Sequence, residues 1–351
     1  MFPRVIINLE KYRHNLRFLL DICHDKSISM MAVSKVFCAD HNLVNIMIEE
    51  KVDFIADSRI QNLAIINCDI PKVLLRLPMI GEVSKVVKYS DISLNSELST
   101  VTALNEEASK VGKVHGIIIM IDLGDLREGI FDENEVYDFV KNTLTLSNIS
   151  IRGIGVNLTC YGGVIPTNSL LNKLVEYKNN IESKFDIELD IISGGNSSTI
   201  DLLMNEAIPL GINNLRLGES LVLGRETAYG DYIDKTYDDV FTLEVDIIEV
   251  KEKPSVPIGQ IGMNAFGKVP QFIDNGNILR AILAIGKQDV DHLELIPFDT
   301  IKLIGSSSDH IIADLSNASS IYEVGDTMLF KLTYSSILSL MTSKYVVKTY
   351  E

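Results

Sequence analysis

The sequence predicts an α/β fold in which a (β/α)8 barrel of the TIM type is followed by a C-terminal all-β domain. Eight short apolar runs rich in β-forming residues alternate with amphipathic segments of helix length over about the first 235 residues. Such runs are typical of parallel strands whose outer face is covered by helices, and eight β–α units favour a closed barrel. An open, doubly wound sheet is the alternative. Beyond this region strand-like pieces follow one another without long helices, which indicates the second domain.

The barrel strands are expected where apolar residues cluster between polar turns, and the first is the run S-M-M-A-V-S-K. In chain order the eight strands cover residues 29–35, 52–58, 72–78, 91–96, 114–124, 151–158, 189–195 and 213–219. Between the fourth and fifth strands, residues 96–110 have a helical pattern, and Ser96 and Ser99 suit a helix start. These units together predict a barrel domain over residues 11–234.

The second domain is expected over residues 235–351. Its strands are predicted at 239–250, 279–286, 309–315 and 327–334. Turns rich in proline and glycine, such as K-P-S-V-P-I-G, separate them. The opening segment 5–10 is a further strand that could join either domain.

Composition and charge exclude several classes of protein. The 351 residues include 48 acidic and 32 basic side chains, and the resulting net charge of −16 argues against binding to nucleic acid or to an anionic membrane. The N-terminal apolar run is too short for a signal peptide, and no run reaches membrane-spanning length. The histidines lack metal-ligand spacing, so no metal is expected. The four cysteines are far apart and are expected to be reduced thiols of a cytoplasmic protein: Cys23, Cys38, Cys68 and Cys160.

Candidate site residues gather where the predicted strands end, which is the end at which barrel enzymes build their sites. Lys35 ends the first strand with no acidic neighbour in the sequence, and the motifs G-G-N-S-S (194–198) and R-L-G-E-S (216–220) follow the seventh and eighth strands. Loops of glycine and small hydroxyl residues can bind a phosphate. A lysine facing a phosphate site favours pyridoxal phosphate, since an amine forms an imine with its aldehyde. Ordinary glycine-rich turns are the alternative reading of both motifs.

Several motifs in a fixed order carry a resemblance to a known family. They are I-I-N-L-E-K-Y-R-H-N-L, A-V-S-K, I-D-L-G-D-L-R-E-G-I, N-L-T-C-Y-G-G-V-I-P-T, I-S-G-G-N-S-S, N-N-L-R-L-G-E and S-S-S-D-H-I-I-A-D-L. With them the chain resembles the alanine racemase family of fold-type III pyridoxal-phosphate enzymes over nearly its whole length, and most of all the members that act on ornithine. The resemblance implies a homodimeric racemase with shared active sites that interconverts L- and D-ornithine by two-base α-proton transfer. An alanine, lysine or broad-specificity racemase, a decarboxylase on the same fold, and a non-catalytic carrier of the cofactor are alternatives.

The resemblance also implies roles for individual residues. Lys35 would form the imine with the cofactor and serve as one proton-transfer base, and Arg216 would meet the pyridine nitrogen. Arg127 would reach the phenolic oxygen of the cofactor and the carboxylate of the substrate. Asn157 stands where the family usually has a histidine beside the ring. The other cofactor-binding residues, mainly around the phosphate, would be Asn196, Ser197, Gly218, Glu219 and Tyr334. Ion pairs of the two arginines with neighbours such as Glu128 or Glu219 are the structural alternative.

Two features depart from the family pattern, and the first is the segment V-F-C-A-D after Lys35, where family members have A-N-A-Y-G and so a tyrosine that is missing here. The partner subunit's tyrosine that usually serves as the opposite base has no counterpart in residues 257–267. A racemase needs a proton donor on each face of the carbanion, and the candidates for the second base are Cys160, Tyr161, Asp309 and His310. A distal ammonium group on the substrate would also require a carboxylate. For that role the candidates are Asp125, Asp309 and Glu226.

Overall fold

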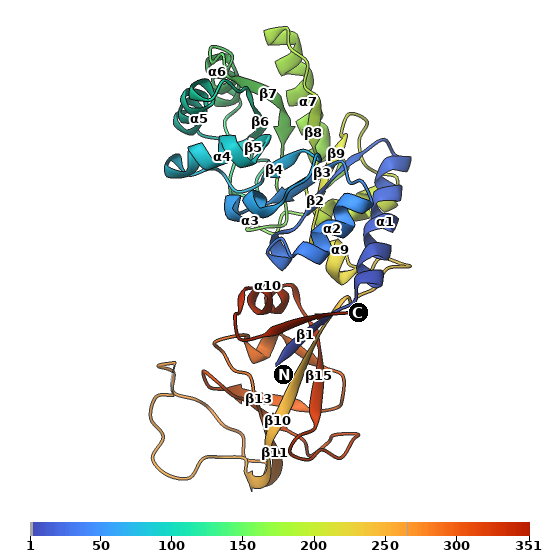
Figure 1. Cartoon of the computed structure of the whole chain (residues 1–351), viewed down its shortest axis with the longest axis vertical. Helices are drawn as coiled ribbons and strands as arrows, with labels where there is room; N and C mark the ends of the chain where they lie inside the picture. Colours follow the sequence, from blue (N-terminus) through green and yellow to red (C-terminus); the bar gives the residue numbers. More distant parts are fainter. Residues whose placement is uncertain (1–2, 265) are drawn as a thin grey trace. The chain divides into compact units, whose positions relative to one another are not determined.

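The computed structural model describes residues 3–264 and 266–351, which form two compact units (Figure 1). Lys11–Asp238 make up one unit, and the N-terminal segment up to Glu10 joins Asp239–Glu351 in the other. Ala265 lies outside the described residues; it belongs to residues 257–267, the segment in which the expected tyrosine has no counterpart.

The unit Lys11–Asp238 is built on a closed barrel of eight parallel strands in chain order, each hydrogen-bonded to the next and the last to the first. The strands are β2 (Ser29–Val33), β3 (Phe54–Asp57), β4 (Lys72–Leu74), β5 (Ile92–Asn95), β6 (His115–Met120), β7 (Ile149–Gly155), β8 (Ile191–Ser193) and β9 (Asn214–Leu217). All eight overlap the predicted strands, so the predicted (β/α)8 barrel is confirmed and the open-sheet alternative is wrong.

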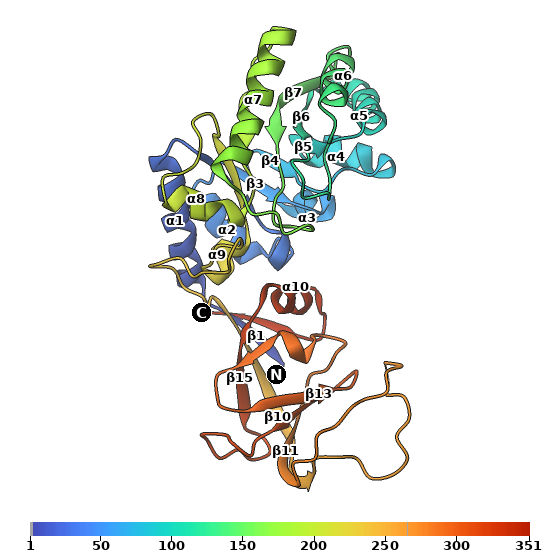
Figure 2. The ribbon, with the colours of Figure 1, turned by 180° about the vertical axis from the view of Figure 1, so that it is seen from behind.

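Helices alternate with the barrel strands and cover the outside of the barrel (Figure 1, Figure 2). They are α1 (Leu9–Asp25), α2 (His41–Glu49), α3 (Ile60–Ile65), α4 (Val83–Tyr89), α5 (Leu98–Lys110), α6 (Glu133–Thr143), α7 (Asn168–Phe185), α8 (Ile200–Met204) and α9 (Glu219–Leu223). The Asp132 side chain caps α6 by accepting from the amides of its first turn. The helix expected over 96–110 begins at Leu98 with Glu97 at its N-cap, so neither Ser96 nor Ser99 caps it.

The core of this unit follows from the alternation of side chains along each strand. In β6, Ile118 and Met120 belong to an apolar cluster whose buried members all come from barrel strands. Ile117 and Ile119 belong to a second cluster that includes residues of α5, α6 and α7. Successive side chains of a strand point to opposite faces, so the first cluster fills the barrel and the second holds the helices onto it.

The other unit contains a largely antiparallel sheet with the order β12-β15-β10-β11-β14-β13. These strands are β10 (Phe241–Pro254), β11 (Asn277–Leu283), β12 (Leu295–Pro297), β13 (Lys302–Ser306), β14 (Ile311–Asp314) and β15 (Thr327–Leu332). The N-terminal strand β1 (Arg4–Ile7) pairs with β10 and with β16 (Val347–Tyr350), so it joins this sheet and not the barrel. One helix, α10 (Tyr334–Thr342), follows β15 and begins with a capping box made by Thr333 and Ser336.

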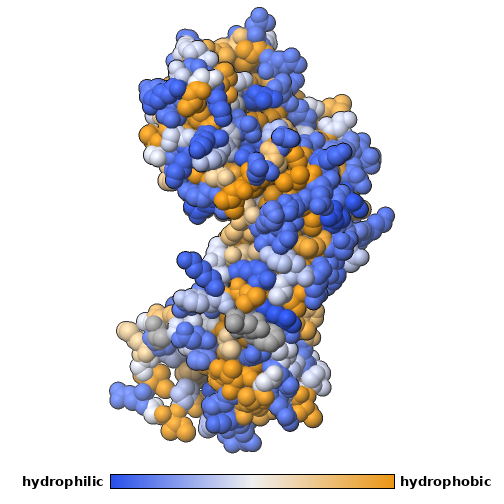
Figure 3. Space-filling view, viewed as in Figure 1, coloured by the Kyte–Doolittle hydropathy of each residue, from blue (hydrophilic) through white to orange (hydrophobic). Residues whose placement is uncertain are grey.

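Polar and apolar residues are interspersed on the face of the molecule shown in Figure 3. Hydrophilic residues cover much of this face. Within residues 3–264 and 266–351, the helices are all too short or too polar to cross a bilayer.

Candidate active site

The carboxyl ends of the barrel strands bring together residues that are far apart in the sequence. Lys35 follows β2, Asn157 follows β7, and Ser197 follows β8. Arg216 lies in β9, which is hydrogen-bonded to β2 with Met31 opposite Arg216. The lysine and the arginine, 181 positions apart by their residue numbers, therefore come from neighbouring strands.

Lys35 is presented by a tight turn that a buried carboxylate stabilises. It opens a single 3-10 turn, Lys35–Phe37, directly after β2. The preceding Ser34 donates its hydroxyl to Asp57 Oδ2 at 2.7 Å. Asp57 ends β3, is fully buried, and interacts electrostatically with Lys35; burial raises the pKa of its carboxyl, and its hydrogen bonds oppose the rise. Asp57 was not among the residues predicted from the sequence, although its place at the end of an apolar strand was the available signal.

Arg216 is a buried cation held by neutral acceptors. It is only 3% exposed, and its guanidinium donates to Ser193 Oγ, to Val156 O at 2.7 Å and to Asn157 Oδ1 at 2.6 Å. The loss of solvation lowers its pKa to about 10. The alternative ion pair between Arg216 and Glu219 is not formed, because Glu219 pairs with Arg225 at 2.6 Å.

Arg127 lies in the β6–α6 loop and forms the ion pair that was the structural alternative for it. Its Nε and Nη2 donate to the two carboxylate oxygens of Glu128, the second at 2.5 Å. Burial by itself would lower the pKa of Arg127, but the hydrogen bonds that Arg127 donates to Glu128, together with the charges of nearby acidic groups, raise it overall. Glu128 also accepts from Asn157 Nδ2, so a side-chain network joins Arg127, Glu128, Asn157 and Arg216. Glu128 was predicted from the sequence only as a possible ion-pair partner of an arginine, not as a residue of the site.

The loop after β8 has the features of a phosphate site. Gly195 has a φ of +120°, and an added Cβ would lie 2.6 Å from Thr199 Oγ1, so glycine is required there. Ser197 Oγ lies 3.1 Å from Ser220 Oγ in the first turn of α9. Within the part of the chain that the structure describes, the buried Ser198 hydroxyl has no hydrogen-bond partner. An unsatisfied buried hydroxyl is unfavourable, so this site fits a ligand group such as the phosphate of pyridoxal phosphate.

A third loop carries two of the candidates for the second base. Asp125 accepts from the amides of Tyr161 at 2.9 Å and Val164 at 3.1 Å and thereby fixes this loop. Cys160 is solvent-accessible, and its Sγ lies 3.3 Å from Asn196 Nδ2 of the phosphate loop. Desolvation of the sulfur raises the pKa of the thiol, and the charges of Arg127 and Arg216 oppose that rise. Tyr161 is 77% exposed.

The remaining predicted residues either belong to the β-rich unit or already accept hydrogen bonds from backbone amides. Asp309 and His310 lie between β13 and β14, and Tyr334 is the first residue of α10, so all three belong to the β-rich unit. Asp309 accepts from Ser308 Oγ at 2.7 Å. Of the carboxylates proposed to bind a substrate ammonium group, Asp125 is used by backbone amides. Glu226 likewise accepts from the amides of Ala228 and Asp231 at 2.7 and 2.8 Å, so neither of these predictions agrees with the contacts observed.

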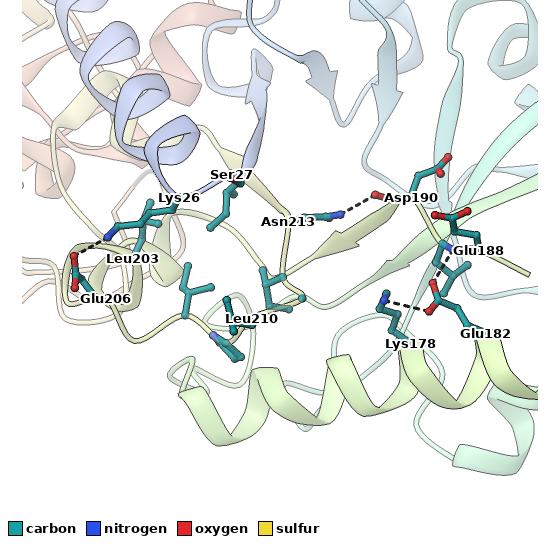
Figure 4. Close-up of a pocket in the computed structure, with 16 residues that line it drawn as sticks. Lys26, Ser27, Lys178, Glu182, Glu188, Asp190, Leu203, Glu206, Leu210 and Asn213 are labelled. Atoms are coloured by element: carbon teal, nitrogen blue, oxygen red, sulfur yellow. Dashed lines mark hydrogen bonds and ion pairs between the residues drawn. The ribbon is translucent and has the colours of Figure 1, made fainter.

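A pocket of about 790 Å³ opens at the opposite, amino end of the barrel (Figure 4). Its lining includes the residues that precede β2, β8 and β9 in the sequence. Ion pairs border it, with Lys26 bonded to Glu206 at 2.6 Å and Lys178 to Glu182 at 3.1 Å. None of the predicted site residues lines this pocket. The chemistry of the carboxyl end therefore does not extend to it.

Comparisons with protein families, with known sequences and with solved structures all identify amino-acid racemases as similar proteins. The model of the family described as "Alanine racemase, N-terminal domain" matches residues 7–226. The chain is 48% identical over 350 residues to the ornithine racemase of Acetoanaerobium sticklandii, which covers 99% of each chain. It is 37% identical over 355 residues to the lysine racemase of Thermotoga maritima, covering 100% of this chain and 99% of that one. The solved alanine racemase of Bartonella henselae with covalently bound pyridoxal phosphate has a TM-score of 0.76 at 16% identity and covers 100% of each chain.

Proposed function

The chain belongs to the alanine racemase family, and from this premise we propose that it is a pyridoxal-phosphate-dependent racemase that interconverts L- and D-ornithine. One structural observation carries the proposal: Lys35 and the buried Arg216 come from paired strands at the same end of the barrel. The full-length similarity to an ornithine racemase supports the choice of substrate. Lysine is the second candidate, because a lysine racemase is also similar over its full length.

The residues at the carboxyl end of the barrel fit the cofactor. Lys35 would bind it covalently, and Arg216 would lie at the ring nitrogen beside Asn157. Ser197, Gly218 and the amide of Glu219 would hold its phosphate, together with Asn196 of the same loop. Bound there, pyridoxal phosphate would take up the electron pair that remains when an amino acid loses its α-proton. Arg216 has neutral hydrogen-bond acceptors and stays cationic near pH 7, so it would donate a hydrogen bond to the ring nitrogen without giving up its proton.

Two side chains would move the α-proton, one on each face of the substrate. Lys35 is the base on one face. We propose Cys160 for the other, in preference to Tyr161, Asp309 and His310. Two features support this choice: its sulfur lies beside Asn196 of the phosphate loop, and its raised pKa keeps it a protonated donor near neutral pH. Arg127 would orient the α-carboxylate of the substrate.

A homodimer in the cytoplasm is part of the proposal. Several apolar side chains in the loop between β10 and β11 are exposed, among them Ile258 (91%), Met263 (76%) and Ile273 (77%). Exposed apolar groups of this kind are typical of surfaces that a partner covers. Tyr334 and the second subunit's β-rich unit would then complete each active site. The four cysteines are free thiols, which supports a reducing compartment.

Circular dichroism of L-ornithine over time, with the purified protein and added pyridoxal phosphate, tests the proposal. We expect the signal to decay to zero, with L-alanine unchanged and L-lysine measured alongside. The Lys35→Ala variant should leave all three signals constant. Release of carbon dioxide would identify a decarboxylase, and cofactor binding without α-proton exchange would identify a carrier. Either result would contradict the proposal.

A further inference from the structure

Glu128 places a carboxylate inside the network that joins the two arginines. Its side chain is 15% exposed, and it bonds both to the guanidinium of Arg127 and to the amide of Asn157. The Arg127–Glu128 pair contributes one positive and one negative charge to a partly desolvated region. Removing one partner of an ion pair in such a region is unfavourable, because the remaining charge is desolvated and has no partner.

Several other carboxylates near this end of the barrel already fix the backbone or bind another arginine. Asp122 accepts from the amide of Gly124 at 2.8 Å, whereas Asp125 and Glu226 also hold loop amides. Glu219 binds Arg225. Turning Asp122, Asp125 or Glu226 toward a ligand would leave these loop amides without their acceptors. Glu128 differs because it accepts hydrogen bonds from two side chains of the candidate site itself, Arg127 and Asn157.

We propose that Glu128 recognises the distal ammonium group of a diamino acid by an exchange of ion pairs, an inference that rests on the proposed function. The α-carboxylate of the substrate replaces Glu128 at Arg127, and the released Glu128 accepts the distal ammonium. One positive and one negative charge arrive with these two groups, so every charge keeps a partner. A monoamino acid such as alanine brings the carboxylate alone and leaves Glu128 desolvated without a cation, which disfavours its binding.

The test compares L-ornithine with L-norvaline, which has the same chain length and lacks only the distal ammonium group. Binding is measured by calorimetry on borohydride-treated holoenzyme, in which Lys35 is permanently bonded to the cofactor, so the readout does not depend on turnover. We expect the wild type to bind ornithine about 10- to 100-fold more tightly than norvaline. Glu128→Gln should reduce this ratio to within about threefold. Glu206→Gln, which removes an exposed carboxylate at the other end of the barrel, should leave it unchanged.

The outcomes separate this inference from the proposed function. If Glu128→Gln weakens both ligands by the same factor, Glu128 only positions Arg127 and the inference is overturned. Glu128→Asp retains the charge and should retain a preference for ornithine; a ratio near one in this variant would also overturn it. Failure of the wild type to racemise ornithine would instead refute the proposed function, and the ligand ratio would still test the role of Glu128.

Discussion

Substitution of Gly153 by alanine should strongly destabilise the barrel. Gly153 lies in β7 opposite Ile191 of β8, and a Cβ built on it would lie 1.8 Å from the carbonyl oxygen of Ile191. Carbon and oxygen approach to about 3.3 Å in close contacts between strands, so the two strands would have to separate by about 1.5 Å. Backbone atoms of a closed barrel cannot move this far without breaking hydrogen bonds.

The expected magnitude combines strain and lost hydrogen bonds. Overpacking of a tight core destabilises by about 1–3 kcal/mol, and each broken backbone hydrogen bond adds about 1 kcal/mol. We therefore expect Gly153→Ala to lower the free energy of unfolding by about 3–5 kcal/mol. With a urea m-value of about 2–3 kcal/mol/M, the midpoint should fall by about 1–2 M. Because β7 leads to Asn157 and β8 to Ser197, the variant should also bind pyridoxal phosphate more weakly.

Urea unfolding followed by far-ultraviolet circular dichroism measures the midpoint, and the absorbance of bound cofactor measures its retention. Gly81→Ala is the matched control, because no atom lies within 4 Å of its added Cβ and its φ is not positive. The control should keep the midpoint of the wild type or raise it slightly. A free energy of unfolding for Gly153→Ala within about 0.5 kcal/mol of the wild-type value would refute the claim that β7 and β8 lie so close together.

Three further predictions concern the site and the response to pH. Cys160→Ala should reduce the rate of ornithine racemisation about 100-fold or more. In deuterium oxide, this variant should still exchange the α-proton of one enantiomer only. Equal exchange of both enantiomers would exclude Cys160 as the second base. Burial lowers the pKa of His115, which contacts Ser93 at 2.9 Å, to about 4. Between pH 6.5 and 4 the unfolded chain therefore binds more protons than the folded protein, and the free energy of unfolding should fall by about 2–3 kcal/mol from pH 7 to 4.5. Urea unfolding of the His115→Gln variant at these two pH values should not show this loss. Burial alone would raise the pKa of Asp125, but the loop amides lower it, so its ionised form stabilises the fold above pH 4. Asp125→Asn should unfold at lower urea than the wild type at pH 7, and the difference should shrink below pH 4.

The sequence predicted the barrel well because the signal is local. Each strand is a short apolar run, and the alternation with helices is visible without any knowledge of distant contacts. The strands that the sequence analysis missed are β12, β13 and β16, which are short or lie at the margin of the sheet. Leu295–Pro297 has only three residues and ends in proline, so it lacks the length and the pattern of a strand. These residues form a strand only because they pair with β15, which lies far away in the sequence, and a local pattern cannot reveal that contact.

The site was less predictable for the same reason. Lys35 and Arg216 could be identified from strand ends and from a family resemblance. The roles of Asp57 and Glu128 depend on partners that lie 23 and 29 positions away, Ser34 and Asn157. Asp125 was proposed as a ligand for a substrate because its charge is visible in the sequence, whereas the backbone amides that occupy it are not.

The network around Arg216 connects the stability of the barrel with its chemistry. Asn157 extends from β7, Ser193 ends β8, and both bond to Arg216 in β9, while Ser193 also donates to Asn214 at 2.7 Å. Neutral dipoles from adjacent strands thus solvate the Arg216 cation. Within the network the carboxylate of Glu128 reaches Arg216 only indirectly, because it accepts from Asn157, which in turn accepts from Arg216. Such dipoles stabilise a charge only while their positions are fixed. The spacing of β7, β8 and β9 therefore determines both how stable the barrel is and whether Arg216 remains charged where the cofactor would bind.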